Sequence, residues 1–155
     1  MKNLLTGFLF LVLISGLSAE SLTAQDRGGG FGIGVILGEP TGITPKVQLS
    51  NSTALAGGVA WAFGGKTTFH LHLDYQIHNY NLAQAERGTL SFYYGLGARI
   101  LLRDDPRVGA RFPLGINYLF DSAPVEIFLE IAPIFDLVPS TEFNGNGGIG
   151  VRFFL

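Results

Sequence analysis

The stretch TTFHLHLDYQIH, residues 67–78, decides the fold. Its residues alternate strictly between an apolar set and a polar set. The apolar set is Phe69, Leu71, Leu73, Tyr75 and Ile77, and the polar set is His70, His72, Asp74, Gln76 and His78. A period of two residues is that of a β-strand, in which successive side chains point to opposite faces. This segment therefore predicts an extended strand with one apolar face and one polar face.

The same period recurs along the chain, and no stretch after residue 25 shows a helical period. Turn-forming residues separate the runs, most clearly Glu39-Pro40-Thr41-Gly42 and Arg103-Asp104-Asp105-Pro106. We expect residues 79–88 and 133–146 to be connections. The pattern predicts eight antiparallel strands, at residues 29–38, 43–49, 53–63, 67–78, 89–102, 107–119, 125–131 and 147–155.

Three prolines conflict with continuous strands. Pro45, Pro113 and Pro133 lie in or beside the predicted runs, and proline lacks the backbone N–H that a β-ladder uses. We therefore expect these prolines at strand ends or bulges.

Composition excludes several classes of protein. Charged residues make up 14% of the 155 residues, and 22 residues are glycine. An ordinary soluble domain has roughly 25% charged residues, so this composition argues against a typical cytosolic enzyme. The formal net charge of −2 provides no basic surface for nucleic acid. The chain has no cysteine, which excludes disulfides, cysteine-ligated metals and a cysteine-anchored lipid.

The N-terminus has the features of a cleaved signal peptide. Lys2 precedes the apolar run Leu4–Ile14, and small residues follow at Ala19 and Ala24. The apolar run is shorter than the roughly 20 residues that a membrane-spanning helix needs. We expect cleavage after Ala24 or Ala19, which divides the chain into a signal peptide (1–24) and one barrel domain (25–155). The alternative is a buried N-terminal helix.

The content of the polar face indicates which face points inward. In a soluble barrel of the lipocalin type, the apolar face points inward and the other face is rich in Thr, Lys, Glu and Gln. Here the second face carries mainly glycine and alanine with single charges of both signs, which suits the narrow interior of an eight-stranded barrel. The expected interior charges are Lys46, Asp74, Arg99, Arg111, Glu126, Glu130 and Arg152.

The apolar face suits contact with lipid. It forms a continuous band, and its aromatic residues are available for the membrane interfaces: Trp61, Tyr75, Tyr94 and Tyr118. The sequence therefore predicts an all-β fold, a closed antiparallel up-and-down transmembrane β-barrel of about eight strands. A secreted soluble lipocalin-like barrel that binds a ligand remains the alternative.

Two segments resemble small outer-membrane barrels of the OmpA/OmpX-like type. Residues 148–155 resemble the terminal-strand signal that the barrel-assembly machinery reads, with Gly150, Phe153 and Leu155 at the matching positions. The first hairpin, residues 32–42, resembles the opening of a family of short-looped outer-membrane barrel proteins. The resemblance implies an outer-membrane location, contact with outer-membrane lipid and with the assembly machinery, and no reaction.

The histidine-rich strand raises the possibility of a metal site. His70, His72 and Asp74 share one face, with His78 near the strand end. Residues two apart on a strand lie about 6.6–6.8 Å apart, so tilted rings could converge on one ion. The preferred interpretation is that these side chains form hydrogen bonds inside the barrel, without a metal or other cofactor.

A lipid-modifying enzyme is the other candidate chemistry. Barrel deacylases typically carry a His-x-Ser pair, whereas the corresponding stretch here is His70-Leu71-His72, and Ser91 is the only interior serine. Glu126 and Glu130 are about 13 Å apart along their strand, too far for paired acid/base catalysis. We therefore expect no enzymatic activity.

These observations predict a monomeric integral outer-membrane protein with a structural or interaction role in the bacterial envelope. The narrow interior predicts no significant conductance. If the first strand starts from the periplasm, the turns at 39–42, 64–66, 103–106 and 133–146 face outward.

Overall fold

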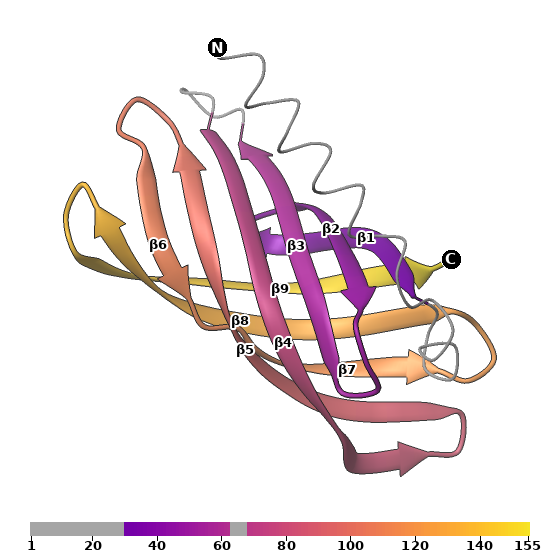
Figure 1. Cartoon of the computed structure of the whole chain (residues 1–155). Helices are drawn as coiled ribbons and strands as arrows, with labels where there is room; N and C mark the ends of the chain where they lie inside the picture. Colours follow the sequence, from indigo (N-terminus) through magenta and orange to yellow (C-terminus); the bar gives the residue numbers. More distant parts are fainter. Residues whose placement is uncertain (1–29, 63–67) are drawn as a thin grey trace.

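The computed structural model describes residues 30–62 and 68–155, and this part of the chain is all-β (Figure 1). Its nine antiparallel strands are β1 (Phe31–Glu39), β2 (Gly42–Gln48), β3 (Thr53–Ala62), β4 (Thr68–Ala85), β5 (Gly88–Leu102), β6 (Arg107–Arg111), β7 (Leu114–Phe120), β8 (Val125–Val138) and β9 (Glu142–Phe154). No helix of a length and hydropathy suited to crossing a membrane occurs within these residues. The predicted signal peptide and the turn at 64–66 lie outside the described residues.

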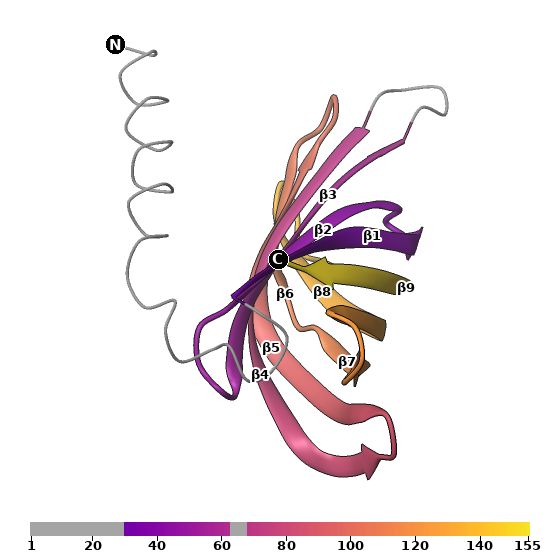
Figure 2. The ribbon, with the colours of Figure 1, turned by 90° about the vertical axis from the view of Figure 1, so that its right-hand side faces the viewer.

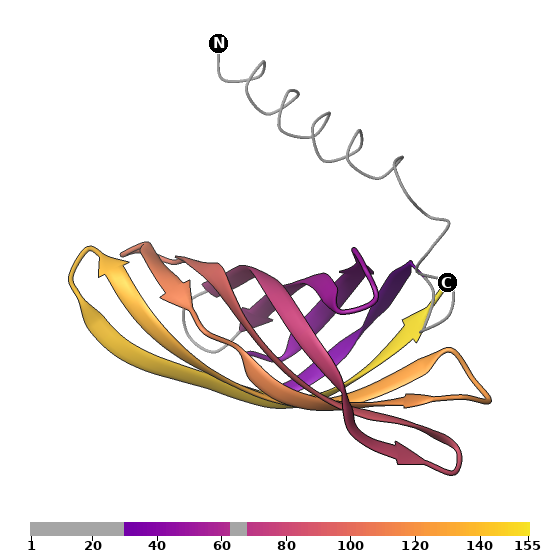
Figure 3. The ribbon, with the colours of Figure 1, turned by 60° about the horizontal axis from the view of Figure 1, so that its bottom comes forward.

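The strands form one ring-like sheet. Consecutive strands pair from β1 to β5, β5 pairs with both β6 and β7, and both of these pair with β8. β8 pairs with β9, which returns to β1. The strands accordingly curve around a common interior, as Figures 2 and 3 show. We call the end that holds Gly30, Leu155 and the turns after β2, β4 and β7 the basal end, and the other end the apical end.

β6 and β7 occupy a single position in the ring. Both pair with β5 in one unbroken register, in which Gly97 lies opposite Arg111 and Tyr94 lies opposite Leu114. The interruption falls at Phe112 and Pro113, because Pro113 has no N–H to donate, although its carbonyl still accepts the Gly95 N–H at 2.9 Å. The nine strands therefore fill eight positions, and the predicted run 107–119 corresponds to one of them.

The expectation for the other two prolines is wrong, because Pro45 lies inside β2 and Pro133 lies inside β8. The ladder between β2 and β3 skips Thr44 and Pro45. There the Thr44 hydroxyl donates to the carbonyl of Gly57 at 3.0 Å, which supplies a hydrogen bond that a proline cannot. Pro133 still accepts a hydrogen bond from the Phe112 N–H at 2.9 Å.

Both predicted long connections are also wrong, since strands occupy most of residues 79–88 and 133–146. In the first, the register between β4 and β5 shifts between Asn79 and Ala83, and this irregularity breaks the period in the sequence. In the second, the alternation does continue, with Ile134 and Asp136 buried and Leu137 exposed. Pro133 obscured this continuation because proline usually ends a strand.

The two faces of the sheet follow the predicted alternation. Large apolar side chains are exposed on the outer face of every ring position, among them Val35, Ile43, Val59, Leu73, Leu96, Ile116, Ile131 and Ile149. The polar set of β4 points inward. Its members His70, Asp74, Gln76 and His78 are buried, and His72 is half-buried. The prediction that the bulky apolar positions face outward is confirmed.

Candidate functional site

The interior of the ring holds an ionic network, which is the main candidate site. Among the described residues, four cationic and four carboxylate side chains are buried: Lys46, Arg99, Arg111, Arg152, Asp74, Glu126, Glu130 and Asp136. Buried ions need partners of opposite sign because they have lost the stabilisation of bulk water. The equal numbers of positive and negative groups meet that requirement for the network as a whole.

The basal part of the network is a triad of Lys46 on β2, Glu126 on β8 and Arg152 on β9. The Lys46 ammonium is 2.7 Å from Glu126 Oε2, and Arg152 Nη1 is 2.7 Å from Glu126 Oε1. Arg152 also donates to the Thr44 hydroxyl at 2.7 Å and lies 3.8 Å from the centre of the Phe128 ring. Two cations share one carboxylate, so this triad carries an excess positive charge.

Glycines make room for these long side chains. A side chain at Gly150 would collide with the Phe128 ring, which lies under the Arg152 guanidinium. Gly150 therefore has a packing role in addition to its place in the segment that the sequence predicts to be a terminal-strand signal. The other two residues of that signal point outward, with Phe153 49% and Leu155 77% exposed.

The central part of the network is a triad of opposite composition. Arg111 on β6 donates to Asp74 on β4 and, at 2.5 Å, to Glu130 on β8. The other oxygen of Glu130 accepts the Tyr93 hydroxyl at 2.7 Å and the Gln76 amide at 3.4 Å. Two carboxylates share one cation, so the central triad carries an excess negative charge that complements the basal triad.

The apical part pairs Arg99 with Asp136, whose two oxygens lie 2.5 Å and 2.6 Å from Arg99 Nη2. Asn144 donates to the same carboxylate at 2.7 Å, and Arg107 bridges from Asp136, at 3.6 Å, to Glu142. The sequence interpretation missed Asp136 because it treated 133–146 as a connection. The signal that could have found it is the continued alternation of Ile134 and Asp136 with Phe135 and Leu137.

The histidines lie along the interior face of β4 without converging on one point. The rings of His70 and His72 meet edge to face with centroids 5.5 Å apart, and His72 Nε2 is 3.9 Å from Asp74 Oδ2. His78 stacks on Tyr80 and lies 3.3 Å from Gln76 Oε1. Over the part of the chain that the structure describes, no three side chains of metal-ligating type are grouped around a site.

Ser91 belongs to the basal hydrogen-bond network. Its hydroxyl donates to Asn117, and the Asn117 amide donates to Glu126 at 2.8 Å. The Ser91 hydroxyl therefore donates its hydrogen bond to the amide oxygen of Asn117. This is not the arrangement of a nucleophile held by a histidine base.

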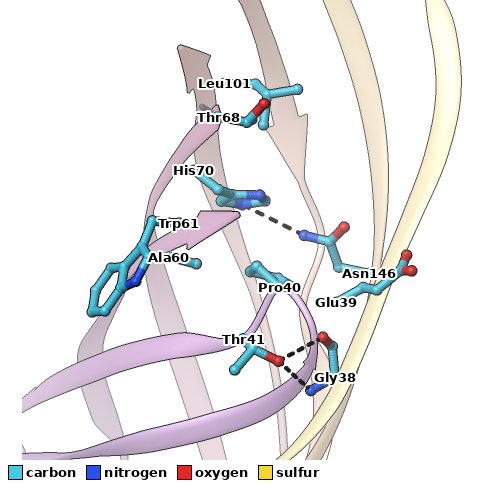
Figure 4. Close-up of a pocket in the computed structure, with 10 residues that line it drawn as sticks. All are labelled: Gly38, Glu39, Pro40, Thr41, Ala60, Trp61, Thr68, His70, Leu101 and Asn146. Atoms are coloured by element: carbon cyan, nitrogen blue, oxygen red, sulfur yellow. Dashed lines mark hydrogen bonds between the residues drawn. The ribbon is translucent and has the colours of Figure 1, made fainter. Parts of the chain in front are cut away.

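A cavity of about 410 Å³ opens at the apical end, above His70 (Figure 4). His70 Nε2 lies 3.5 Å from the Asn146 amide nitrogen, and the turn after β1 forms the facing wall. Thr41 stabilises that turn, since its hydroxyl donates to the Gly38 carbonyl at 2.9 Å. Of the histidines on β4, His70 lines this apical cavity, and His78 lines another cavity, of about 390 Å³, at the basal end.

No family model, curated protein or solved structure matches the chain. The resemblance to small outer-membrane barrels therefore stays a prediction based on the first hairpin and the terminal strand.

Proposed function

We propose that this chain is an integral β-barrel protein of the bacterial outer membrane, with a structural or interaction role in the envelope. The observation that carries the proposal is the division of the ring into an apolar outside and an ionic inside. Leu73 and Leu96 are each 58% exposed and Ile131 is 59% exposed, at mid-strand positions around the ring. A soluble protein rarely exposes so large a continuous apolar surface, whereas lipid contact requires one.

The height of the apolar band supports the same proposal. On β5, outward apolar residues extend from Phe92 to Leu102. The ten residue-to-residue steps between them correspond to about 33 Å along a strand. At a strand tilt of ~40° this length covers about 25 Å of membrane thickness, the height of the apolar band in outer-membrane barrels.

The filled interior supports a role without a pore. Arg111, Tyr93 and Phe128 are almost completely buried in the middle of the ring, so their side chains occupy the space through which water and ions would have to pass. A soluble ligand-binding barrel would need the apolar face turned inward, and the described residues have the opposite arrangement. We therefore favour a sealed membrane barrel over the lipocalin-like, metal-binding and lipid-modifying alternatives.

In this proposal the signal peptide directs export, and the basal end lies in the periplasm. The terminal strand, with Gly150, Phe153 and Leu155, is then the segment that the barrel-assembly machinery reads. The barrel acts as a monomer in outer-membrane lipid, without cofactor or nucleic acid.

Fractionation of cells that produce the full chain tests the location. We expect the protein in the outer-membrane fraction, with an unboiled band that migrates differently from the boiled band in a denaturing gel. This shift reflects a closed barrel that resists detergent until it is heated. Recovery of the protein in the soluble fraction without a heat-dependent band would contradict the proposal.

Replacing Leu73 by Arg tests which solvent the outer face meets. Leu73 lies at the middle of the outward series on β4, opposite Gly57 and Ala98, so the longer side chain has lateral space. In a bilayer we expect the free energy of unfolding to fall by about 2–4 kcal/mol, the cost of an arginine near the midplane. The measurement is urea unfolding of protein folded into lipid vesicles.

The matched control is Leu82→Arg, on the same strand but past the last residue that pairs with β3. Leu82 is 55% exposed, close to the 58% of Leu73, and we expect a change within about 0.5 kcal/mol there. Equal effects of the two substitutions would show that both positions meet the same solvent, against the proposal.

A further inference from the structure

The outer face of the ring has an apolar groove over β5, β7 and β8, which lie side by side (Figure 1). Two hollows, of about 370 and 140 Å³, make up this basal groove, and Ile116 and Leu129 line both of them. The larger hollow reaches Leu114 in the apical direction, and the smaller one reaches Leu90 and Tyr118 in the basal direction. Leu114 and Tyr118 are four residues apart on β7, so the groove runs about 13 Å along the strand. Its shape suits a slender apolar chain.

Tyr118 supplies the polar end of the basal groove. The other lining residues on the outer face are apolar, so the Tyr118 hydroxyl is the hydrogen-bonding group there. A Cβ atom at Gly88 would lie 2.6 Å from this hydroxyl oxygen, which shows that the phenol end of Tyr118 rests over Gly88. The Tyr118 ring packs edge to face on Phe120, with the centroids 4.9 Å apart. These contacts hold the hydroxyl at the basal edge of the groove.

Charged side chains stand at the rim beyond this hydroxyl. Arg87 directly precedes Gly88, and its carbonyl accepts the Asp121 N–H at 3.1 Å, which joins the turn after β4 to the turn after β7. Within the described residues, the exposed charged side chains of the basal end are those of Glu86, Arg87 and Asp121. The apolar groove therefore leads to a rim with one cation and two acids.

We propose that the basal groove binds an acyl chain of a phospholipid whose headgroup combines a phosphate with a primary ammonium, as in phosphatidylethanolamine. The Arg87 guanidinium and the Tyr118 hydroxyl are donors for the phosphate oxygens. The carboxylates of Glu86 and Asp121 are acceptors for the ammonium N–H groups. The inference rests on the proposed membrane location, to which it adds the chemistry of one bound lipid.

The charges of the rim favour this headgroup over two others. With two acids against one cation, the rim disfavours a lipid such as phosphatidylglycerol, which brings a negative charge alone. The trimethylammonium group of phosphatidylcholine has no N–H to donate to Glu86 or Asp121. A phosphate joined to a primary ammonium provides a hydrogen-bonding partner for both signs of charge on the rim.

Native mass spectrometry of the purified, detergent-folded protein tests the headgroup. Phosphatidylethanolamine, phosphatidylglycerol and phosphatidylcholine with identical acyl chains are added separately at equal concentration. We expect the protein to retain one molecule of phosphatidylethanolamine, and to retain it about five-fold more than either of the other lipids. Equal retention of the three lipids, or retention of none of them, would overturn the inference.

Two pairs of variants locate the lipid. Arg87→Gln removes the cation of the rim, and we expect it to lower retention of phosphatidylethanolamine about ten-fold, whereas Arg103→Gln in an apical turn changes it less than about two-fold. Ile116→Trp fills the groove and is expected to lower retention about five-fold. Leu73→Trp adds the same ring on the outer face of β4 and serves as its control. Equal effects within either pair would contradict the assigned place.

Failure of this inference is distinguishable from failure of the proposed function. Recovery of the protein in the soluble fraction of cells would contradict the membrane location. An outer-membrane protein that retains the three lipids equally would contradict the lipid site alone. The heat-dependent gel band shows for each variant whether it is folded, and the headgroup comparison on the unsubstituted protein does not depend on any variant.

Discussion

Replacing Arg111 by Met is expected to lower the free energy of unfolding by about 3–5 kcal/mol. The methionine fills much of the arginine's volume, so the change removes the charge without opening a large cavity. It leaves Asp74 and Glu130 buried near each other without the cation that both of them contact. Two uncompensated carboxylates inside a protein lose the stabilisation of water and gain no partner in return.

Urea unfolding of the protein in lipid vesicles measures this effect. The triple variant Asp74→Asn/Arg111→Met/Glu130→Gln removes all three charges together. We expect it to regain part of the lost stability, because no central carboxylate is left without its cation, whereas the excess cation of the basal triad loses its compensation. Arg103→Met, in an exposed turn, is expected to change stability by less than about 0.5 kcal/mol. A loss in the triple variant as large as that of Arg111→Met would show that hydrogen-bond geometry, and not charge balance, dominates the central triad.

Glu126→Gln is expected to produce a loss of similar size, about 3–5 kcal/mol, for the opposite reason. The substitution keeps the shape of the side chain but leaves Lys46 and Arg152 buried beside a neutral amide. The Thr44 hydroxyl and the Phe128 ring still contact Arg152, whereas Glu126 is the only acid within 4 Å of the Lys46 ammonium among the described residues. The same vesicle unfolding assay measures the change.

Glu86→Gln, at the exposed tip of the β4–β5 hairpin, is the control for Glu126→Gln. A comparison with Arg111→Met adds a second control, since the two substitutions change the net charge of the protein in opposite directions. If both Glu126→Gln and Arg111→Met destabilise the protein, the loss of stability comes from local ion pairing. Stabilisation by one and destabilisation by the other would instead point to the overall charge of the protein.

The opposite excess charges of the two triads account for how this interior tolerates so many ions. Neither triad is neutral by itself, but the basal triad has one extra cation and the central triad one extra carboxylate. Charges of opposite sign attract more strongly in a medium of low dielectric than in water. The network therefore depends on contacts among strands that are distant in sequence, such as Arg152 with Glu126 and Arg99 with Asp136.

Local residues by themselves determined the strands and their faces. The alternation of TTFHLHLDYQIH predicts one outward and one inward face for β4, and the structure has both. The same rule identified seven of the eight buried charges, because which face of a strand a residue occupies depends only on its position within that strand. The eight predicted strands also correspond to the eight positions of the ring. The break at Pro113 lies within the predicted strand at residues 107–119.

Only the tertiary structure decided the pairing of charges and the lengths of the hairpins. The alternation around Asp136 shows that it points inward, but its partner Arg99 is decided by the placement of β8 beside β6, which the residues around Asp136 do not encode. The β4–β5 hairpin extends beyond β3 because the ladder between β3 and β4 ends at Ile77 whereas β4 continues to Ala85, a difference in length that neither strand shows separately. Register and strand length result from hydrogen bonds between distant segments, so they become visible only once the ring is assembled.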